Sequence, residues 1–208
     1  MHVPVFILLQ KSELWRMIRF TPSSNGIPEP GKVLLAEPFM ADPHFGRKAI
    51  LLCEHNEEGS FGFVLNNFIE VGLNELLDDL PVVECRLSLG GPVKNSNLYY
   101  LHTIEGAPDA ITVKPGLFMG GDFDWVRTLL DAGVQLEGKL RFFIGYAGWT
   151  PGQLEDEIKS CSWFVTNADV DTIMSTESED ETLWKSLITE IGEGFDHIAN
   201  APVDPSMN

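Results

Sequence analysis

The chain has 208 residues, of which 44% are apolar and 22% are charged, and this composition excludes a collagenous, coiled-coil or wholly disordered protein. Fourteen Lys and Arg against thirty-one Asp and Glu leave a net charge of -17 at pH 7, which disfavours non-specific binding to nucleic acid or anionic lipid. No stretch reaches the roughly 18 apolar residues of a membrane-spanning helix, so we expect no membrane association.

The cysteines and the amino terminus bear on the cellular compartment. Cys53, Cys85 and Cys161 stand far apart without a Cys-x-x-Cys pair, which indicates neither a disulfide framework nor a zinc knuckle. Cysteines used so sparingly are typical of a reducing compartment, so we expect a cytoplasmic protein. The first residues include an apolar run but no basic leader or cleavage site, which predicts no signal peptide. A natural start at Met17 instead of Met1 stays open.

Residues 21–31 are rich in Pro, Ser, Asn and Gly, a composition typical of a linker. The remaining length fits about one domain. We therefore expect an arm or linker over residues 1–30, a single domain over residues 31–195 and a loose tail over residues 196–208.

Short β-branched and aliphatic runs, separated by Pro and Gly, predict more strands than helices. The polar loop Asn56–Ser60 has hairpin length and contains Gly59, which predicts an antiparallel pair on either side of it. We expect strands at Lys32–Ala36, Ala49–His55, Phe61–Asn66, Arg86–Leu89, Leu98–His102, Ile111–Val113, Leu117–Met119 and Leu140–Tyr146.

Capping residues and apolar stripes predict four helices. One spans Leu73–Leu80, and one begins after Ser178 and ends at Gly192. Another begins after Asp122 and ends before Gly133, with its buried stripe formed by Trp125, Leu129, Leu130 and Ala132.

The remaining helix begins at Thr150-Pro151-Gly152-Gln153. We expect Thr150 to cap it, Pro151 to take the first helical position and Gln153 to complete a capping box. One face of this helix is expected to carry Leu154, Ile158 and Cys161.

Cys53 and His55 lie two residues apart in a predicted strand, so we expect their side chains on one face and Glu54 on the other. A thiol beside an imidazole is a candidate nucleophile and base, which makes a reactive Cys53 one interpretation. The other is a buried cysteine in an apolar strand, with His55 as a polar residue at its end.

Other patterns predict no metal and no cofactor. The nearest approach to a metal set is His44, His55, His102 and Asp42, and their spacings match no ligand signature. Gly90-Gly91-Pro92 follows an apolar strand, but no nucleotide-binding motif accompanies it, so a sharp turn is favoured over an anion cradle. The hydrolase motif G-x-S-x-G is absent as well.

The stretch Gly145-Tyr146-Ala147-Gly148-Trp149 combines two glycines with two amphipathic rings. Glycines permit a close backbone approach, and the rings suit the lining of a pocket. A packed corner between a strand and the following helix is the competing interpretation.

Four blocks of the sequence together resemble the AlgH/YqgE family: Gly31–Pro38, Cys53–Asn66, Gly90–Val93 and Gly145–Glu157. The similarity runs from about Gly31 to Ile191. It implies an α+β domain with a mixed, largely antiparallel sheet curled into a partly closed barrel and flanked by about four helices. The resemblance also brings the description of a transcriptional regulator, attached to the family through alginate control, and no settled catalytic residues.

Neither a helix-turn-helix nor a basic stripe is apparent, which makes direct nucleic-acid binding unlikely and favours indirect regulation. We hypothesise a non-catalytic domain that binds a small ligand or a protein. Its candidate surface comprises Glu54, His55, Asn56, Asn66, Gly90, Gly91, Pro92, Tyr146, Gly148, Trp149 and Gln153. The alternatives are a thiol-dependent enzyme or redox sensor centred on Cys53, and a regulator that binds DNA directly.

Overall fold

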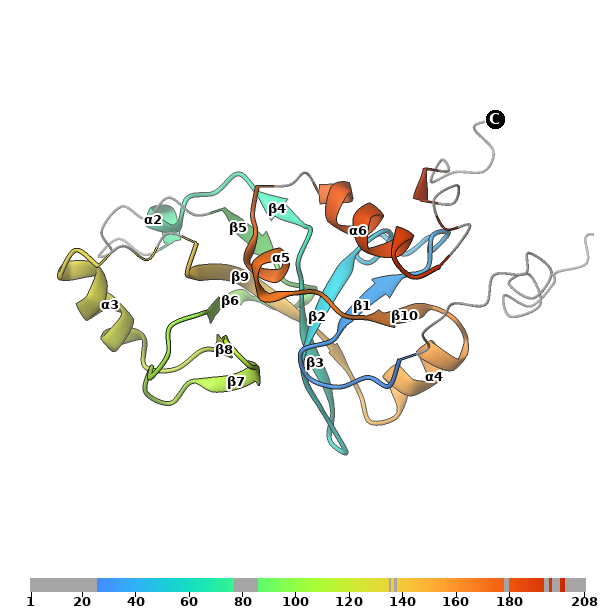
Figure 1. The fold of residues 1–208 in the computed structure, drawn as a ribbon, viewed down its shortest axis with the longest axis horizontal. Coiled ribbons are helices and arrows are strands. Elements are labelled where there is room, and N and C mark those ends of the chain that lie inside the picture. The colour runs from blue at the N-terminus through green and yellow to red at the C-terminus, as the bar shows by residue number, and fades with distance from the viewer. Residues whose placement is uncertain are drawn as a thin grey trace, which may run out of the picture.

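The computed structural model describes residues 26–76, 86–134, 136, 138–177, 180–192, 195 and 199–200 (Figure 1). The strands are β1 (Val33–Ala36), β2 (Ala49–Asn56), β3 (Gly59–Val64), β4 (Phe68–Ile69), β5 (Leu87–Leu89), β6 (Val93–His102), β7 (Ile111–Lys114), β8 (Leu117–Met119), β9 (Leu140–Trp149) and β10 (Trp163–Thr166). The helices are α2 (Leu73–Leu76), α3 (Phe123–Asp131), α4 (Gln153–Lys159), α5 (Val170–Met174) and α6 (Asp180–Thr189). The predicted α+β class is confirmed.

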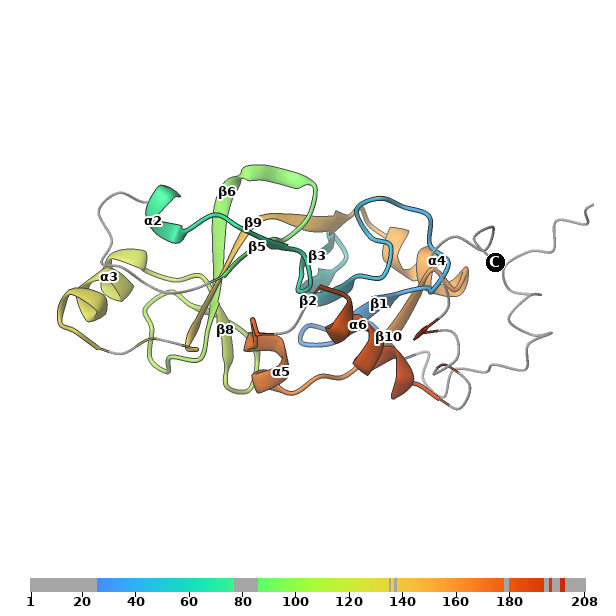
Figure 2. The same cartoon turned by 90° about the horizontal axis from the view of Figure 1, so that it is seen from above.

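The sheet is organised around β9. The strand order is β10-β1-β2-β3-β9-β6-β8-β7, and the ladders are antiparallel except for the parallel pairing of β5 with β9. The first half of β9 pairs with β6 and β5, and its second half pairs with β3. Figure 2 shows β9 passing from beside β6 and β5 to beside β3. The long strand therefore joins two halves of the molecule.

The predicted partly closed barrel is not confirmed, because the sheet stays open between its ends. Among the described strands, no ladder joins β7 to β10. Lys114 of β7 nevertheless reaches across and donates from Nζ to the carbonyl of Ala168, at 2.7 Å. Within the same described segments, no helix has the length and apolar character needed to span a membrane.

Strand β1 and the first five residues of β2, Ala49–Cys53, are buried on both faces, which explains why they are continuous apolar runs. Alternate residues enter two cores. Leu35 and Leu51 pack with α5 and α6, whereas Leu34 and Ile50 pack against α4. Figure 1 shows α6 above these strands and α4 below them. A third core lies in the other half, where α3 covers residues of β5, β6 and β9.

Two glycine-rich segments cross each other where the halves meet. Gly145 has a φ of 68° within β9. A Cβ added to Gly90 would lie 2.3 Å from the carbonyl oxygen of Gly145. A Cβ on Gly91 would lie 2.2 Å from the carbonyl carbon of Tyr146. Gly90 also bridges two strands, since its N–H donates to Ile144 and its carbonyl accepts from the N–H of Val64. Only glycine allows the chain to cross β9 so closely.

Several element boundaries differ from the predictions. Strand β10 was not predicted, because an apolar run of four residues can belong to a strand or to a helix. Its pairing with β1 identifies it as a strand. Strands β6 and β9 each run to ten residues, so Gly145–Trp149 is strand and not a corner. Helix α5 was not predicted, although the Asp169 side chain caps it by accepting from the N–H of Thr172. Ser178, the predicted cap of α6, lies outside the described residues.

Helix α4 begins later than predicted. Its N-cap is Gly152, with a φ of 76°, and the helix starts at Gln153. The Gln153 side chain does accept from the N–H of Thr150, at 3.0 Å, but Thr150 does not cap the helix and Pro151 precedes it. Cys161 also lies beyond its end, so only Leu154 and Ile158 share the predicted buried face.

Helix α3 occupies its predicted place, and the Asp122 side chain caps it by accepting from the N–H groups of Asp124 and Trp125. Its buried stripe is centred on Val126 instead of the predicted residues. Ala132 is the C-cap and is exposed, whereas Trp125 and Leu129 are partly buried beside Val126.

Candidate functional site

The β2–β3 hairpin and the end of β9 line an open surface pocket of about 400 Å³. Strand β3 lies between β2 and β9 and places Phe61 opposite both Glu54 and Gly148. Directly paired residues share a face of the sheet, so the acidic hairpin and the glycine of β9 meet around one ring. The pocket is lined by Glu54, Asn56, Glu58, Gly59, Ser60, Phe61, Val93, Tyr146, Gly148, Trp149, Thr150 and Pro151.

Aromatic rings form the floor of this pocket. The Phe61 and Tyr146 rings lie 4.7 Å apart, and Tyr99 packs edge-on against Tyr146 at 5.8 Å. Both pocket rings are partly exposed, and Val93, at 37% exposure, adds an aliphatic side chain next to them. The floor therefore offers apolar surface and ring faces to a ligand.

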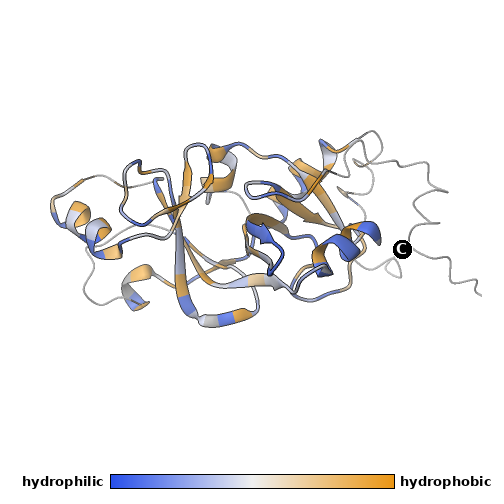
Figure 3. Ribbon diagram, turned by 90° about the horizontal axis from the view of Figure 1, so that it is seen from below, coloured by the Kyte–Doolittle hydropathy of each residue, from blue (hydrophilic) through white to orange (hydrophobic). Residues whose placement is uncertain are grey.

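The rim of the pocket is acidic. Asn56 donates from Nδ2 to Glu54 Oε1 at 2.6 Å and accepts at Oδ1 from the N–H of Glu58 at 2.8 Å. Asn56 therefore holds the turn and orients Glu54, while Glu58 stays exposed. Figure 3 shows the hydrophilic tip of this hairpin as it is seen from below. The combination of carboxylates and ring faces suits a ligand that carries positive charge.

Cys53 and His55 do not form a dyad, and the predicted common face is wrong. The register of β2 against β3 shifts between Leu52 and Glu54, because a bulge inserts Cys53. Cys53 joins the core on the α6 side and is 3% exposed. His55 instead pairs with Ser60 and lies 3.6 Å from Glu155 of α4. Burial raises the pKa of the Cys53 thiol, which keeps it protonated and weakens it as a nucleophile.

A second pocket, of about 460 Å³, lies on the other face of β9 beside α4. Two indole groups share one carboxylate there, since Trp149 and Trp163 donate from Nε1 to Glu157 Oε2 at 2.9 and 2.7 Å. Gln153 donates to the other oxygen of Glu157 at 2.9 Å. The predicted residue Gln153 therefore belongs to this second pocket, which is lined by Met40, Ala41, Asp42, Phe45, Gly148, Trp149, Gln153, Glu157, Ser162 and Trp163.

Gly90, Gly91 and Pro92 stand beside the first pocket and are absent from its lining. Their neighbour Val93 pairs with Tyr146 and enters it. Because the glycines permit the chain crossing, their contribution to the pocket is to fix the position of β9.

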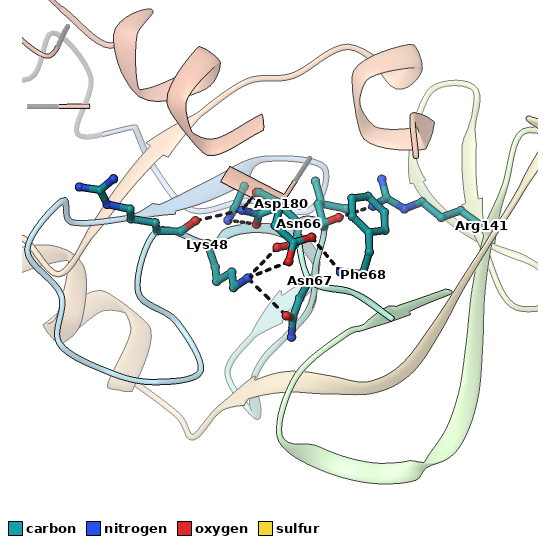
Figure 4. A network of polar contacts seen from close by, with 9 residues as sticks. Lys48, Asn66, Asn67, Phe68, Arg141 and Asp180 are labelled. Atoms are coloured by element: carbon teal, nitrogen blue, oxygen red, sulfur yellow. Dashed lines mark hydrogen bonds and ion pairs between the residues drawn. The ribbon is translucent and has the colours of Figure 1, made fainter. Parts of the chain in front are cut away.

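Asn66 lies away from both pockets, in the network drawn in Figure 4. It is 1% exposed, accepts at Oδ1 from the N–H of Ala49 at 2.8 Å and donates from Nδ2 to the carbonyl of Arg47 at 2.9 Å. It also donates to the carbonyl of Asp180 at 2.5 Å. These bonds tie the start of α6 to the sheet, which gives Asn66 a structural part in the fold.

Arg141 is a fully buried cation beside the same network. Its guanidinium donates to the carbonyls of Leu65, Ile173 and Ser175 and packs 5.2 Å from the Phe143 ring. Burial lowers the pKa of Arg141 to about 9, so the group stays charged at neutral pH. It fastens α5 to the centre of the sheet.

The histidines of the sequence analysis are dispersed. His102 is buried, accepts at Nδ1 from the N–H of Ile104 at 3.3 Å and directs Nε2 to the carbonyl of Gly120 at 3.1 Å. His44 is exposed, and Asp42 accepts from its backbone N–H at 2.8 Å. Within the described segments, no three His, Cys, Asp or Glu side chains gather as a metal site.

Seven lining residues of the first pocket were not among the predicted surface residues: Glu58, Gly59, Ser60, Phe61, Val93, Thr150 and Pro151. Glu58 and Phe61 lie inside the Cys53–Asn66 block that resembles the family, and Val93 directly follows Pro92, so these residues stood close to the predicted surface in the sequence. Pairing of Phe61 with Gly148 brings them into the pocket, and that register is a property of the folded sheet.

Comparisons with known proteins extend over most of the chain. The family model described as AlgH-like matches residues 33–196. The chain is 40% identical over 183 residues to the UPF0301 protein CT0663 of Chlorobaculum tepidum, covering 88% of this chain and 97% of that one. It is 34% identical over 187 residues to a UPF0301 protein of Bacteroides thetaiotaomicron, covering 89% and 94%.

Two solved structures share the fold. The solution structure of the AlgH protein from Pseudomonas aeruginosa has a TM-score of 0.65 and 28% identity, and the match covers 86% of this chain and 98% of that one. The crystal structure of DIP2367 from Corynebacterium diphtheriae has a TM-score of 0.69 and 25% identity, with 86% and 95% covered. The matched region contains the glycine crossing, the hairpin and β9, and this chain belongs to the AlgH-like family of UPF0301 proteins.

Proposed function

We propose that this chain is a non-catalytic binding protein of the cytoplasm, whose ligand or partner protein occupies the pocket between the β2–β3 hairpin and the end of β9. The observation that carries the proposal is the convergence of Glu54, Asn56, Tyr146, Gly148 and Trp149 on one pocket from two distant parts of the chain. An aromatic floor with a few polar groups at its rim is typical of a binding site.

A thiol-dependent reaction at Cys53 is not supported, because the bulge separates the thiol from His55 and the thiol is buried. Direct DNA binding is disfavoured by the net charge of -17. Regulation would then be indirect, through the bound ligand or protein. The small number of cysteines supports the proposed location in the cytoplasm, a reducing compartment.

A ligand screen with a pocket-filling variant tests the proposal. The protein is screened by thermal shift against metabolites, nucleotides and peptides, and every hit is repeated on Gly148→Leu. Gly148 is exposed, and an added Cβ would meet the Tyr146 ring at 3.0 Å, so leucine fills the pocket while the ring shifts slightly. Thr112→Leu, at an exposed position of β7, is the matched control.

We expect at least one hit that stabilises the original chain and Thr112→Leu but not Gly148→Leu. A panel without any hit would refute the binding proposal. Hits that survive Gly148→Leu unchanged would refute the location of the site.

A further inference from the structure

The second half of β9 has one paired edge and one free edge. Strand β3 pairs with Ala147–Trp149 on one side. On the other side, the ladder with β6 ends at the pair Val93 and Tyr146. No other described strand pairs with Ala147–Trp149. In an antiparallel ladder, alternate residues direct N–H and C=O away from their partner strand, so at least one of these three residues presents both groups to the free edge.

This free edge runs between the two pockets. Gly148 and Trp149 line both of them, and Gly148 is exposed. Tyr146 and Gly148 face the hairpin pocket, since Gly148 is paired with Phe61. Trp149 faces the α4 pocket, where it contacts Glu157. A strand laid along the edge would direct alternate side chains into one pocket and then the other.

Both pockets have the same chemistry. The hairpin pocket is lined by Glu54 and Glu58, the α4 pocket by Asp42 and Glu157, and the lining of neither includes Lys or Arg. Each also offers ring surface, from the partly exposed Tyr146 in one and the partly exposed Phe45 in the other. Positively charged side chains would find a carboxylate and an aromatic ring on each face.

We propose that the free edge of β9 at Ala147–Trp149 accepts an extended basic segment of a partner protein as an added strand. This inference rests on the proposed function, because it names the class of ligand for the same site. A small organic cation would occupy only one of the two pockets and would leave the strand edge unused. A second copy of this chain, with a charge of -17, would be repelled by the carboxylates.

The test uses a fluorescein-labelled octapeptide, Lys-Lys-Thr-Thr-Lys-Lys-Thr-Thr, which has two lysines on each face when it is extended. Binding to the full chain is measured by fluorescence anisotropy. A second peptide carries N-methyl groups on all of its backbone amides, and a third has Glu in place of Lys. The two faces of the peptide carry the same lysine pattern, so either of its edges can lie along β9, and methylation of every amide removes the N–H donors from both edges.

We expect the lysine peptide to bind and the methylated peptide to bind about tenfold or more weakly. Glu58→Lys should weaken binding several-fold, whereas Glu105→Lys should not. Both carboxylates are exposed, but Glu105 follows β6 at the opposite end of β9, where His102 pairs with Leu140. The glutamate peptide should not bind.

Equal binding of the lysine peptide and the methylated peptide would refute strand addition, and so would tight binding of the glutamate peptide. Absence of any binding by the lysine peptide would also overturn the inference. If hits from the ligand screen still depend on Gly148, the binding function stands and only the strand-addition inference fails. If neither the screen nor the peptides give binding, both fail.

Discussion

Replacing Asn66 by alanine separates a structural from a binding role for this residue. The substitution removes three hydrogen bonds, those to the N–H of Ala49 and to the carbonyls of Arg47 and Asp180. At a net value of about 1 kcal/mol each, their loss lowers the free energy of unfolding by about 3 kcal/mol. For a chain of this length, that corresponds to a fall in Tm of roughly 6–12 °C.

The neighbouring residue provides the control. Asn67 is half-buried, and within the described part of the chain its side chain accepts one bond, from Lys48 Nζ at 3.3 Å. Asn67→Ala should therefore cost less than about 1 kcal/mol. Urea unfolding followed by fluorescence and by circular dichroism measures both variants, and coincident transitions justify a two-state analysis.

The reasoning is refuted if Asn66→Ala is as stable as Asn67→Ala. It is also refuted if Asn66→Ala keeps its stability but loses the ligands found by the screen, because Asn66 would then belong to a binding surface after all. The first result would mean that the network in Figure 4 contributes little to the docking of α6.

Three further predictions follow from buried groups. Cys53 should resist iodoacetamide in the folded protein and react in denaturant, because burial raises the pKa of its thiol, whereas half-buried Cys161 should react before it. Mass spectrometry of the labelled peptides measures both rates, and rapid labelling of Cys53 in the folded protein would contradict the prediction. Burial lowers the pKa of His102, so as the pH falls through about 6.5 this imidazole is protonated in the unfolded chain before it is protonated in the folded protein. Stability should therefore decline on acidification, and His102→Gln should show a shallower decline in urea midpoints between about pH 7.5 and 5.5; an unchanged slope would show that another group is responsible. Gly91 has a φ of 151°, and a Cβ added there would lie 2.2 Å from the Tyr146 carbonyl carbon. Gly91→Ala should therefore lower the free energy of unfolding by on the order of 3 kcal/mol, and a variant as stable as the original chain would contradict the close crossing.

The parts of the fold that local chemistry determines were predictable. The hairpin between β2 and β3 followed from its polar loop with Gly59, and the start of α3 followed from Asp122. Strand β10 was not predictable in the same way, because Trp163–Thr166 becomes a strand through its pairing with β1, more than a hundred residues earlier in the chain. Non-local pairing decides such short apolar runs, and periodicity within them carries little information.

Some residues of the candidate pocket were selected from the sequence, but the geometry of the pocket could not be predicted. Tyr146, Gly148 and Trp149 were expected near the Glu54 turn, and they line one pocket with it. The Cys53 bulge was invisible in the sequence, because a bulge depends on the register of the partner strand. The same bulge reversed the predicted faces of Glu54 and His55, and it moved Glu54 onto the pocket side.

Hydrogen exchange measured with and without the lysine octapeptide tests the central claim most directly, since it locates the ligand without any substitution. The account predicts slower exchange in two segments, residues 54–61 of the hairpin and residues 146–150 at the end of β9, with residues 138–142 unchanged. Protection confined to other segments, or unchanged exchange under conditions in which the peptide is bound, would contradict a binding site at this edge of the sheet.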